Sequence, residues 1–175
     1  MATKPITDLA EDLRKFVEEG RAQAGPRIVF ALQHEGPWWT GTFGKSWKLS
    51  ATKVRPVNAE NVEQVGEGLV CAPARYTFIT GGDSLSAKRT AKLPQEPPIL
   101  RVPYSKPLYV GNESTYAGFA TNQPGQTIRG TTYEQHAEKY RITASSPDWY
   151  NVYTNGGKIM DDLTEGFRRA GASRL

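Results

Sequence analysis

The chain has 175 residues, of which 38% are hydrophobic and 10% aromatic, and this suits one folded domain with a buried core. Its formal net charge is +4, and its single cysteine, Cys71, excludes an internal disulfide framework and a cysteine-rich metal site. No apolar run approaches about 18 residues and the N-terminal stretch is acidic, so we expect no membrane span, no secretory signal and a soluble cytosolic product.

The first predicted element is an amphipathic helix over residues 6–23. Thr7 can cap its start, and acidic residues follow in the first turn. Apolar residues then recur at helical spacing, at Leu9, Leu13, Phe16 and Val17. Gly20 or Gly25 is expected to end the helix. Gly25-Pro26 predicts a break before a second short element over 27–34, which is a helix or, alternatively, a strand.

The middle of the chain predicts strands and long loops. Apolar and polar residues alternate over 45–57, and strands are also expected over 62–66 and 68–80. Residues 84–98 are polar, basic and end in a proline-rich run, which is typical of an exposed loop. Two short strand-like pieces follow, and a second extended loop covers 119–146, with a short helix near 133–140. The two pieces span 99–102 and 107–111.

A tryptophan-led helix is predicted at the C-terminus. Its apolar stripe comprises Trp149, Val152, Tyr153, Ile159, Met160, Leu163 and Phe167. The glycines at 156 and 157 cost helix propensity without ending the predicted helix. The fold class is therefore α+β: an antiparallel sheet packed against an N-terminal and a C-terminal helix, in one domain over 1–175.

Gly44-Lys45-Ser46 shares letters with a nucleotide-binding P-loop. In that motif a first glycine stands five positions before the second, and a helix follows the serine. Here Trp39 occupies the position of the first glycine, and residues 48–56 favour a strand. We interpret the tripeptide as a corner between helix and strand, with Lys45 pointing to solvent. A small P-loop nucleotide-binding enzyme remains an alternative.

Other catalytic patterns are weak. His34 and His136 stand far apart and lack a second ligand at helical spacing, and Cys71 lies within a predicted strand. His34 suits a helix end, and Asp161-Asp162 suits a solvated helix face. We therefore expect no catalytic residues, no metal, no cofactor and no enzymatic activity.

A basic stretch with nearby tyrosines runs through the proline-rich region. It contains Lys88, Arg89, Lys92, Arg101 and Lys106, with Tyr104 and Tyr109. Such a strip can follow a phosphate backbone, so sequence-nonspecific nucleic-acid binding is a second alternative. A solvated loop explains the same residues more simply.

The order of short motifs resembles the tail-completion family of tailed bacteriophages, related to minor tail protein Z. In that family a Thr-Gly turn and a small residue open the first strand, and a Tyr-Ala pair follows a strand ending in Gly-Asn. Thr40-Gly41 with Ser46 matches the first motif, and Gly111-Asn112 with Tyr116-Ala117 matches the second. The resemblance covers about residues 5–55 and 99–168.

This resemblance implies a non-enzymatic part of the virion neck or upper tail, assembled in the host cytoplasm, that completes the tail for joining to the head. Its partners would be other copies in a ring, neighbouring neck and tail proteins, and channel DNA passing nearby without specific binding. A closed ring needs two different complementary patches on each copy. The interface candidates are Trp38, Trp39, Lys88, Arg89, Lys92, Tyr104 and Tyr116.

Overall fold

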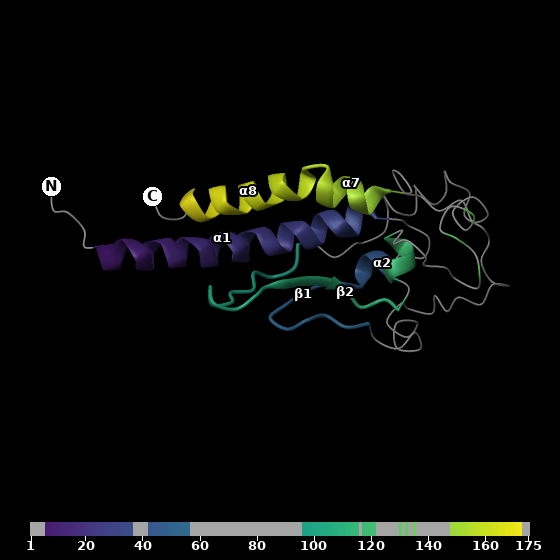
Figure 1. Ribbon diagram of the computed structural model, residues 1–175, viewed down its shortest axis with the longest axis horizontal. Helices are drawn as coiled ribbons and strands as arrows, with labels where there is room; N and C mark the ends of the chain where they lie inside the picture. The colour runs from purple at the N-terminus through teal and green to yellow at the C-terminus, as the bar shows by residue number, and fades with distance from the viewer. Residues whose placement is uncertain are drawn as a thin grey trace.

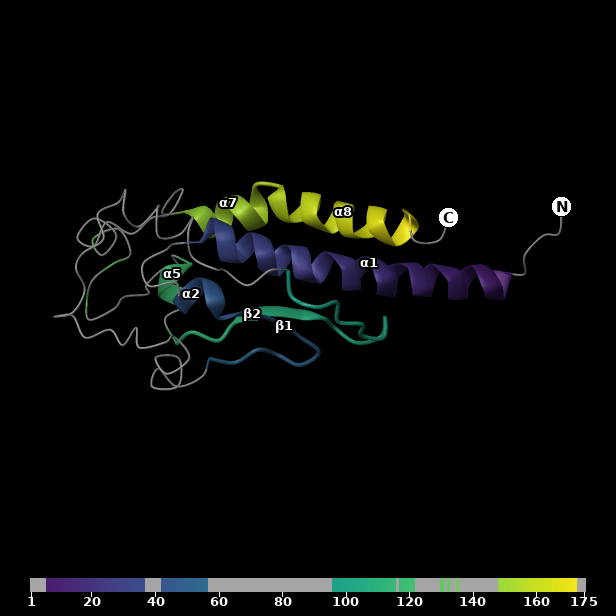
Figure 2. The same ribbon diagram turned by 180° about the vertical axis from the view of Figure 1, so that it is seen from behind.

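The computed structural model describes residues 6–36, 42–56, 96–115, 117–121 and 148–172, together with Gly130, Thr132 and Gln135. The elements in chain order are α1 (Ile6–Glu35), α2 (Thr42–Lys45), β1 (Trp47–Ser50), β2 (Tyr109–Asn112), α5 (Ala117–Ala120), α7 (Trp149–Asn155) and α8 (Lys158–Ala172). The long helix α1 lies in the middle: α7 and α8 run along one side of it, and β1 and β2 lie on the other (Figures 1 and 2). The predicted α+β fold class is confirmed.

Helix α1 is one continuous helix of 30 residues, so the predicted break at Gly25-Pro26 is wrong. Pro26 lies inside the helix and is buried, although it removes one backbone N–H from the ladder. Packing on both sides of α1 outweighs this cost. An added Cβ on Gly25 would lie 2.8 Å from Leu49 Cδ1, while Ala24 lies against Gly166 on the opposite layer.

The two glycines expected to end α1 are contact positions instead. A Cβ on Gly20 would collide with the ring of Phe167, and one on Gly25 would collide with Leu49. Glycine therefore lets α8 approach one side of α1 and lets the sheet approach the other. The α1–α8 contact, defined here as the helix seam, runs from Glu35 and Lys158 at one end to Phe16 and Phe167 at the other.

The C-terminal apolar stripe forms two helices rather than one. Gly157 has φ +100°, a left-handed conformation that ends α7, and its carbonyl accepts from the N–H groups of Met160 and Asp161 as α8 begins. Trp149 and Tyr153 are buried, as the stripe predicts, but Val152 and Met160 are exposed. The break at Gly157 changes the orientation of α8 relative to α7. A prediction that assumes one uninterrupted helix therefore places Val152 and Met160 on the buried face, although both are exposed.

β1 and β2 pair antiparallel, with Trp47 opposite Asn112 and Ser50 opposite Tyr109. The predicted strand at 45–57 is shortened to β1, and the strand-like piece at 107–111 corresponds to β2. Residues 99–102 form no strand. The strands predicted over 62–66 and 68–80 lie outside the described residues. So does most of the 119–146 loop, although Ala117–Ala120 is the short helix α5.

The core is an aromatic cluster at the end of α1 where α2, β1 and α7 meet. Phe43 packs edge-on against both Trp47 and Trp149, with ring centroids 5.7 and 6.0 Å apart. Trp47 also stacks on Tyr150. The indole N–H of Trp149 donates to the carbonyl of Ala120 at 2.9 Å, so the buried ring leaves no unpaired donor.

Gly166→Ala is expected to destabilise the fold. The new Cβ would lie 2.5 Å from Ala24 Cβ and 2.6 Å from its backbone, and overpacking of this kind costs about 1–3 kcal/mol. Gly171→Ala is the matched control in the same helix, because its Cβ meets only Phe16 Cε2 at 4.0 Å and alanine favours the helix by up to about 1 kcal/mol. Urea unfolding of both variants checks this. Equal stability of the two would contradict the close approach at Gly166.

Candidate functional site

The loop that precedes β2 is fixed to α1 by three charged residues of the helix. The Arg21 guanidinium donates to four carbonyls, those of Val102, Pro103, Tyr104 and Lys106, at 3.0–3.4 Å. Glu18 accepts from the N–H of Tyr104 at 2.7 Å, and Glu19 accepts two hydrogen bonds from Arg101. Charge-assisted bonds to backbone groups position this loop without any secondary structure of its own.

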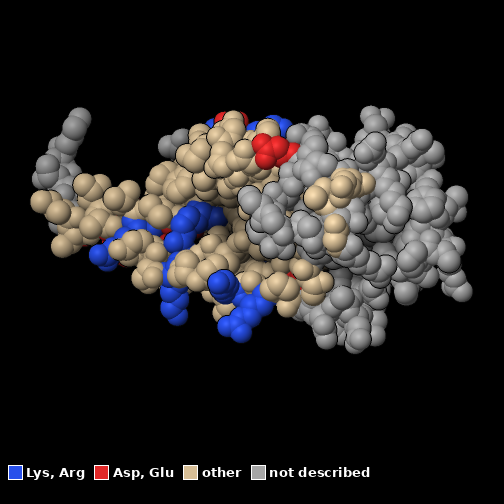
Figure 3. Space-filling model, turned by 45° about the vertical axis from the view of Figure 1, so that its right-hand side comes forward, with Lys and Arg blue, Asp and Glu red and all other residues tan. Residues whose placement is uncertain are grey.

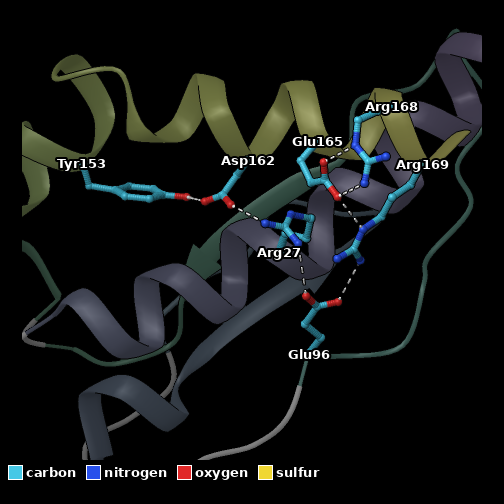
Figure 4. Close-up of polar contacts among 7 residues, drawn as sticks. All are labelled: Arg27, Glu96, Tyr153, Asp162, Glu165, Arg168 and Arg169. Carbon is cyan, nitrogen blue, oxygen red and sulfur yellow. Dashed lines mark hydrogen bonds and ion pairs between the residues drawn. The ribbon is translucent and has the colours of Figure 1, made fainter. Parts of the chain in front are cut away.

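A chain of polar contacts crosses the helix seam (Figure 4). The Tyr153 hydroxyl donates to Asp162 Oδ2 at 2.9 Å, and Asp162 Oδ1 accepts from Arg27 at 3.3 Å. Arg27 also lies 3.8 Å from Glu96, which in turn lies 3.6 Å from Arg169. Glu165 completes the chain with bonds to Arg168 and Arg169. We call these seven residues the seam network.

The environment of Tyr153 keeps it neutral. Burial raises the pKa of the Tyr153 hydroxyl, and the hydrogen bond to Asp162 raises it further. A phenol with a raised pKa donates a hydrogen bond to Asp162 and does not release its proton near neutral pH. Tyr153 therefore acts as a fixed donor in the seam network.

The seam network is balanced in charge, since its three arginines face three carboxylates. Each carboxylate already accepts from or pairs with an arginine, so the three carboxylates are engaged in structural contacts. Its physical role is to join α1, α8 and the segment at Glu96. Glu96, near the end of the loop predicted over 84–98, is therefore held by ion pairs with Arg27 and Arg169.

The elements that flank Gly44-Lys45-Ser46 follow in the reverse order to those of a P-loop. Gly44 and Lys45 end helix α2, Ser46 is buried and β1 begins at Trp47, whereas a P-loop follows a strand and opens a helix. The Ser46 N–H donates to the carbonyl of Phe43 at 3.2 Å, which closes the turn. This geometry is the predicted corner between helix and strand, although Lys45 is half-buried rather than fully solvated.

The N-terminal half of α1 carries large apolar side chains in solvent. Ile6, Leu9 and Leu13 are 85%, 62% and 60% exposed. They continue the face of α1 that contacts α8, because Phe16, Gly20 and Ala24 follow at the same helical spacing. α8 ends near Phe16, and α1 extends beyond it (Figure 1). We call Ile6, Leu9 and Leu13 the apolar overhang.

Among the predicted interface candidates only Tyr104 belongs to the described part of the chain. It is exposed, and the Arg14 guanidinium lies 5.7 Å from the centre of its ring. The other six candidates lie outside that part, as do Cys71 and His136: Trp38, Trp39, Lys88, Arg89, Lys92 and Tyr116. His34 stands in the last turn of α1, as predicted, where its Nδ1 lies 2.7 Å from the carbonyl of Phe30.

Sequence reasoning missed Arg21 and Arg27, and the solvated helix face predicted for Asp161-Asp162 is wrong for Asp162, which is 17% exposed and bonded to Arg27 and Tyr153. The carbonyls that Arg21 binds stand 81 or more positions away, and Arg27 and Asp162 are 135 positions apart, so no local spacing reveals these contacts. The helical spacing of Leu9 and Leu13 indicates an apolar helix face. Such spacing alone predicts that the face is buried, whereas these side chains are exposed.

Searches against protein-family models, curated proteins and solved structures find no match to this chain. Within the described residues, no three His, Cys, Asp or Glu side chains come together in a way that could hold a metal ion. In the same part of the chain, no helix is both long and apolar enough to cross a membrane.

Asp162→Ala is expected to lower the free energy of unfolding by about 1–3 kcal/mol, because Arg27 and the buried Tyr153 hydroxyl both lose their acceptor. Asp161→Ala is the control: it removes an exposed carboxylate from the adjacent position of the same helix. Chemical denaturation of both variants makes the comparison. A loss of similar size in the control would show that the seam network contributes no stability.

Acid is expected to weaken the Glu165 contacts. The hydrogen bond from Arg168, with a smaller contribution from Arg169, lowers the pKa of Glu165 to about 2. Its contribution to stability is therefore complete above its ordinary pKa of about 4.3 and is lost as the pH falls towards 2. Thermal unfolding of wild type and Glu165→Gln should differ most above pH 5 and converge near pH 2. A difference independent of pH would contradict this assignment.

Proposed function

We propose that this protein is a non-enzymatic structural component that assembles with copies of itself in the neck or upper tail of a tailed bacteriophage. The apolar overhang carries the assembly part of the proposal. The motif order around β1 and β2 supports the place in the virion.

The overhang suits a second copy of the chain as its partner. Burying a side chain such as Ile or Leu contributes about 1.5–3 kcal/mol, and three of them lie exposed along one helical face. This face is continuous with the helix seam, so it already has the spacing that packs against another helix. The described residues place nothing over it within one copy.

A ring requires a second, different patch on each copy, and α7 and α8 offer one. Val152 and Met160 are 46% and 58% exposed, on α7 and at the start of α8. These elements lie at the opposite end of the helical layer from the N-terminus of α1 (Figure 1). Two apolar patches at opposite ends suit head-to-tail contact, in which the overhang of one copy docks on the neighbour.

The virion assignment draws on the two motifs of the tail-completion family. β1 begins directly after Ser46, and β2 ends at Gly111-Asn112 with Ala117 opening α5 shortly afterwards. Ser46 and Gly111-Asn112 therefore lie beside the two strands, as the resemblance expects, whereas Thr40, Gly41 and Tyr116 lie outside the described residues. In such an assembly the loops that the sequence predicts over 84–98 and 119–146 would contact neighbouring subunits.

Leu9→Gln with Leu13→Gln is expected to reduce self-association of the purified protein, measured by light scattering after size exclusion over a range of concentrations. The double variant removes apolar area from the overhang without changing the net charge. Glu11→Gln with Lys15→Gln is the control, because it removes an exposed ion pair from the other face of the same turns and is also neutral in charge. An equal effect of both doubles, or a wild type monomeric at every concentration, would contradict assembly through the overhang.

The virion assignment is tested separately with antibody-labelled electron microscopy of purified phage particles. Label at the head–tail junction is the expected outcome. Particles without label would overturn the structural role in the virion, even if the isolated protein self-associates.

A further inference from the structure

We propose that the outer face of the β1–β2 sheet, with the segment that follows β1, binds the phosphate backbone of duplex nucleic acid. The cationic side chains that carry this surface are Lys48, Lys53 and Arg55, and we call them the sheet cations. The proposal does not depend on the virion role, because it concerns a different surface and a different ligand.

The pairing of the strands shows which side chains face outward. Leu49 points towards α1, since it would meet a Cβ on Gly25 at 2.8 Å, and Val110 opposite it shares that inner face. Successive residues of a strand alternate between faces. Lys48 and Ser50, with Gly111 and Tyr109 opposite them, therefore form the outer face.

The segment after β1 folds back over this outer face. A Cβ on Gly111 would lie 2.6 Å from Val54 Cβ, so Val54 lies directly over the strand position that pairs with Lys48. Lys53 and Arg55 flank Val54 in the chain and are exposed. The fold thus gathers the three sheet cations around Gly111, although only one of them belongs to a strand.

These cations are poorly neutralised. Lys48 lies 3.9 Å from Glu113, at the limit of an ion pair, and neither Lys53 nor Arg55 pairs with a carboxylate of the described chain. Residues 42–56 contain four Lys and Arg and no Asp or Glu. A surface of one sign held close together creates a field that attracts a polyanion.

Charge is separated between the two sides of the molecule. Residues 42–56 and 96–115, on the sheet side, hold six basic and two acidic residues, whereas α1 has four Lys and Arg against six Asp and Glu. In Figure 3 blue groups lie along the middle and lower part of the view, whereas red and blue atoms occur together near the top, where α7 and α8 run. This arrangement would orient the sheet side towards a phosphate backbone.

The chemistry of the surface favours nucleic acid over an anionic membrane. Membrane-surface binding combines basic residues with apolar side chains that enter the lipid. The described residues of the outer face include no exposed large apolar side chain, and Val54 is half-buried. Lysine and arginine with a nearby tyrosine, Tyr109, are typical donors to phosphate oxygens.

Fluorescence anisotropy with a labelled duplex of about three helical turns (~30 bp) tests the proposal. With three phosphate contacts, the affinity of the wild-type protein is expected to fall about 40-fold between about 50 and about 200 mM salt. Binding that is absent at the lower salt concentration would overturn the proposal. Equal binding to phosphatidylglycerol vesicles would instead identify a membrane and also overturn it.

The triple variant Lys48→Gln, Lys53→Gln, Arg55→Gln tests whether the sheet cations form the binding surface for the duplex. It is expected to weaken duplex binding at least 10-fold at the lower salt concentration and to flatten the salt dependence. The control Lys15→Gln, Lys158→Gln, Arg168→Gln removes the same charge from α1 and α8 and should change the affinity less than 3-fold. Circular dichroism confirms that both variants fold.

Equal losses in the two triple variants would show that only net charge matters and would overturn the assignment to the sheet. A sheet variant with altered oligomeric state and unchanged duplex binding would also overturn it, in favour of contact with the acidic helix α1 of another copy. The outcome is separable from that of the proposed function, because duplex binding by the isolated protein requires neither the apolar overhang nor a virion.

Discussion

The close approach of α1 and α8 is the constraint on which the rest of the structure depends. Glycine on one helix faces a larger side chain on the other at both contacts, Gly166 against Ala24 and Gly20 against Phe167. The small separation brings Arg27 within reach of Asp162 and seats the aromatic cluster at the far end of the seam. α1 also continues as one helix through Pro26, while α8 and the sheet pack against its two sides.

Polar contacts then fix what apolar packing leaves free. Arg21 holds the loop before β2 through its carbonyls, and the seam network holds the chain at Glu96. Surface ion pairs of this kind contribute little stability individually, but several joined together define one geometry. In this protein they decide where irregular segments meet the helices, and this determines the position of β2 and of the outer sheet face.

The surfaces left over differ in chemistry and lie on different parts of the fold. The apolar overhang extends the helix seam into solvent, while the sheet cations lie on the opposite side of α1. The apolar overhang suits contact with another helix, and the sheet cations suit a polyanion, so the two proposed contacts need not compete. A protein with both could join copies of itself through its helices while presenting its sheet to nucleic acid.

The sequence by itself determined the α+β class, the two terminal helical regions and the corner at Gly44-Lys45-Ser46, because period, capping and turn residues act locally. It did not determine that Gly20 and Gly25 are contact positions, that Leu9 and Leu13 lie in solvent, or that Gly157 divides the last helix. Helical spacing shows that a face is apolar, but only the tertiary structure decides whether another element covers it. The contact between Arg27 and Asp162 also depends on the tertiary structure, since the two residues are 135 positions apart and meet only after the two helices pack.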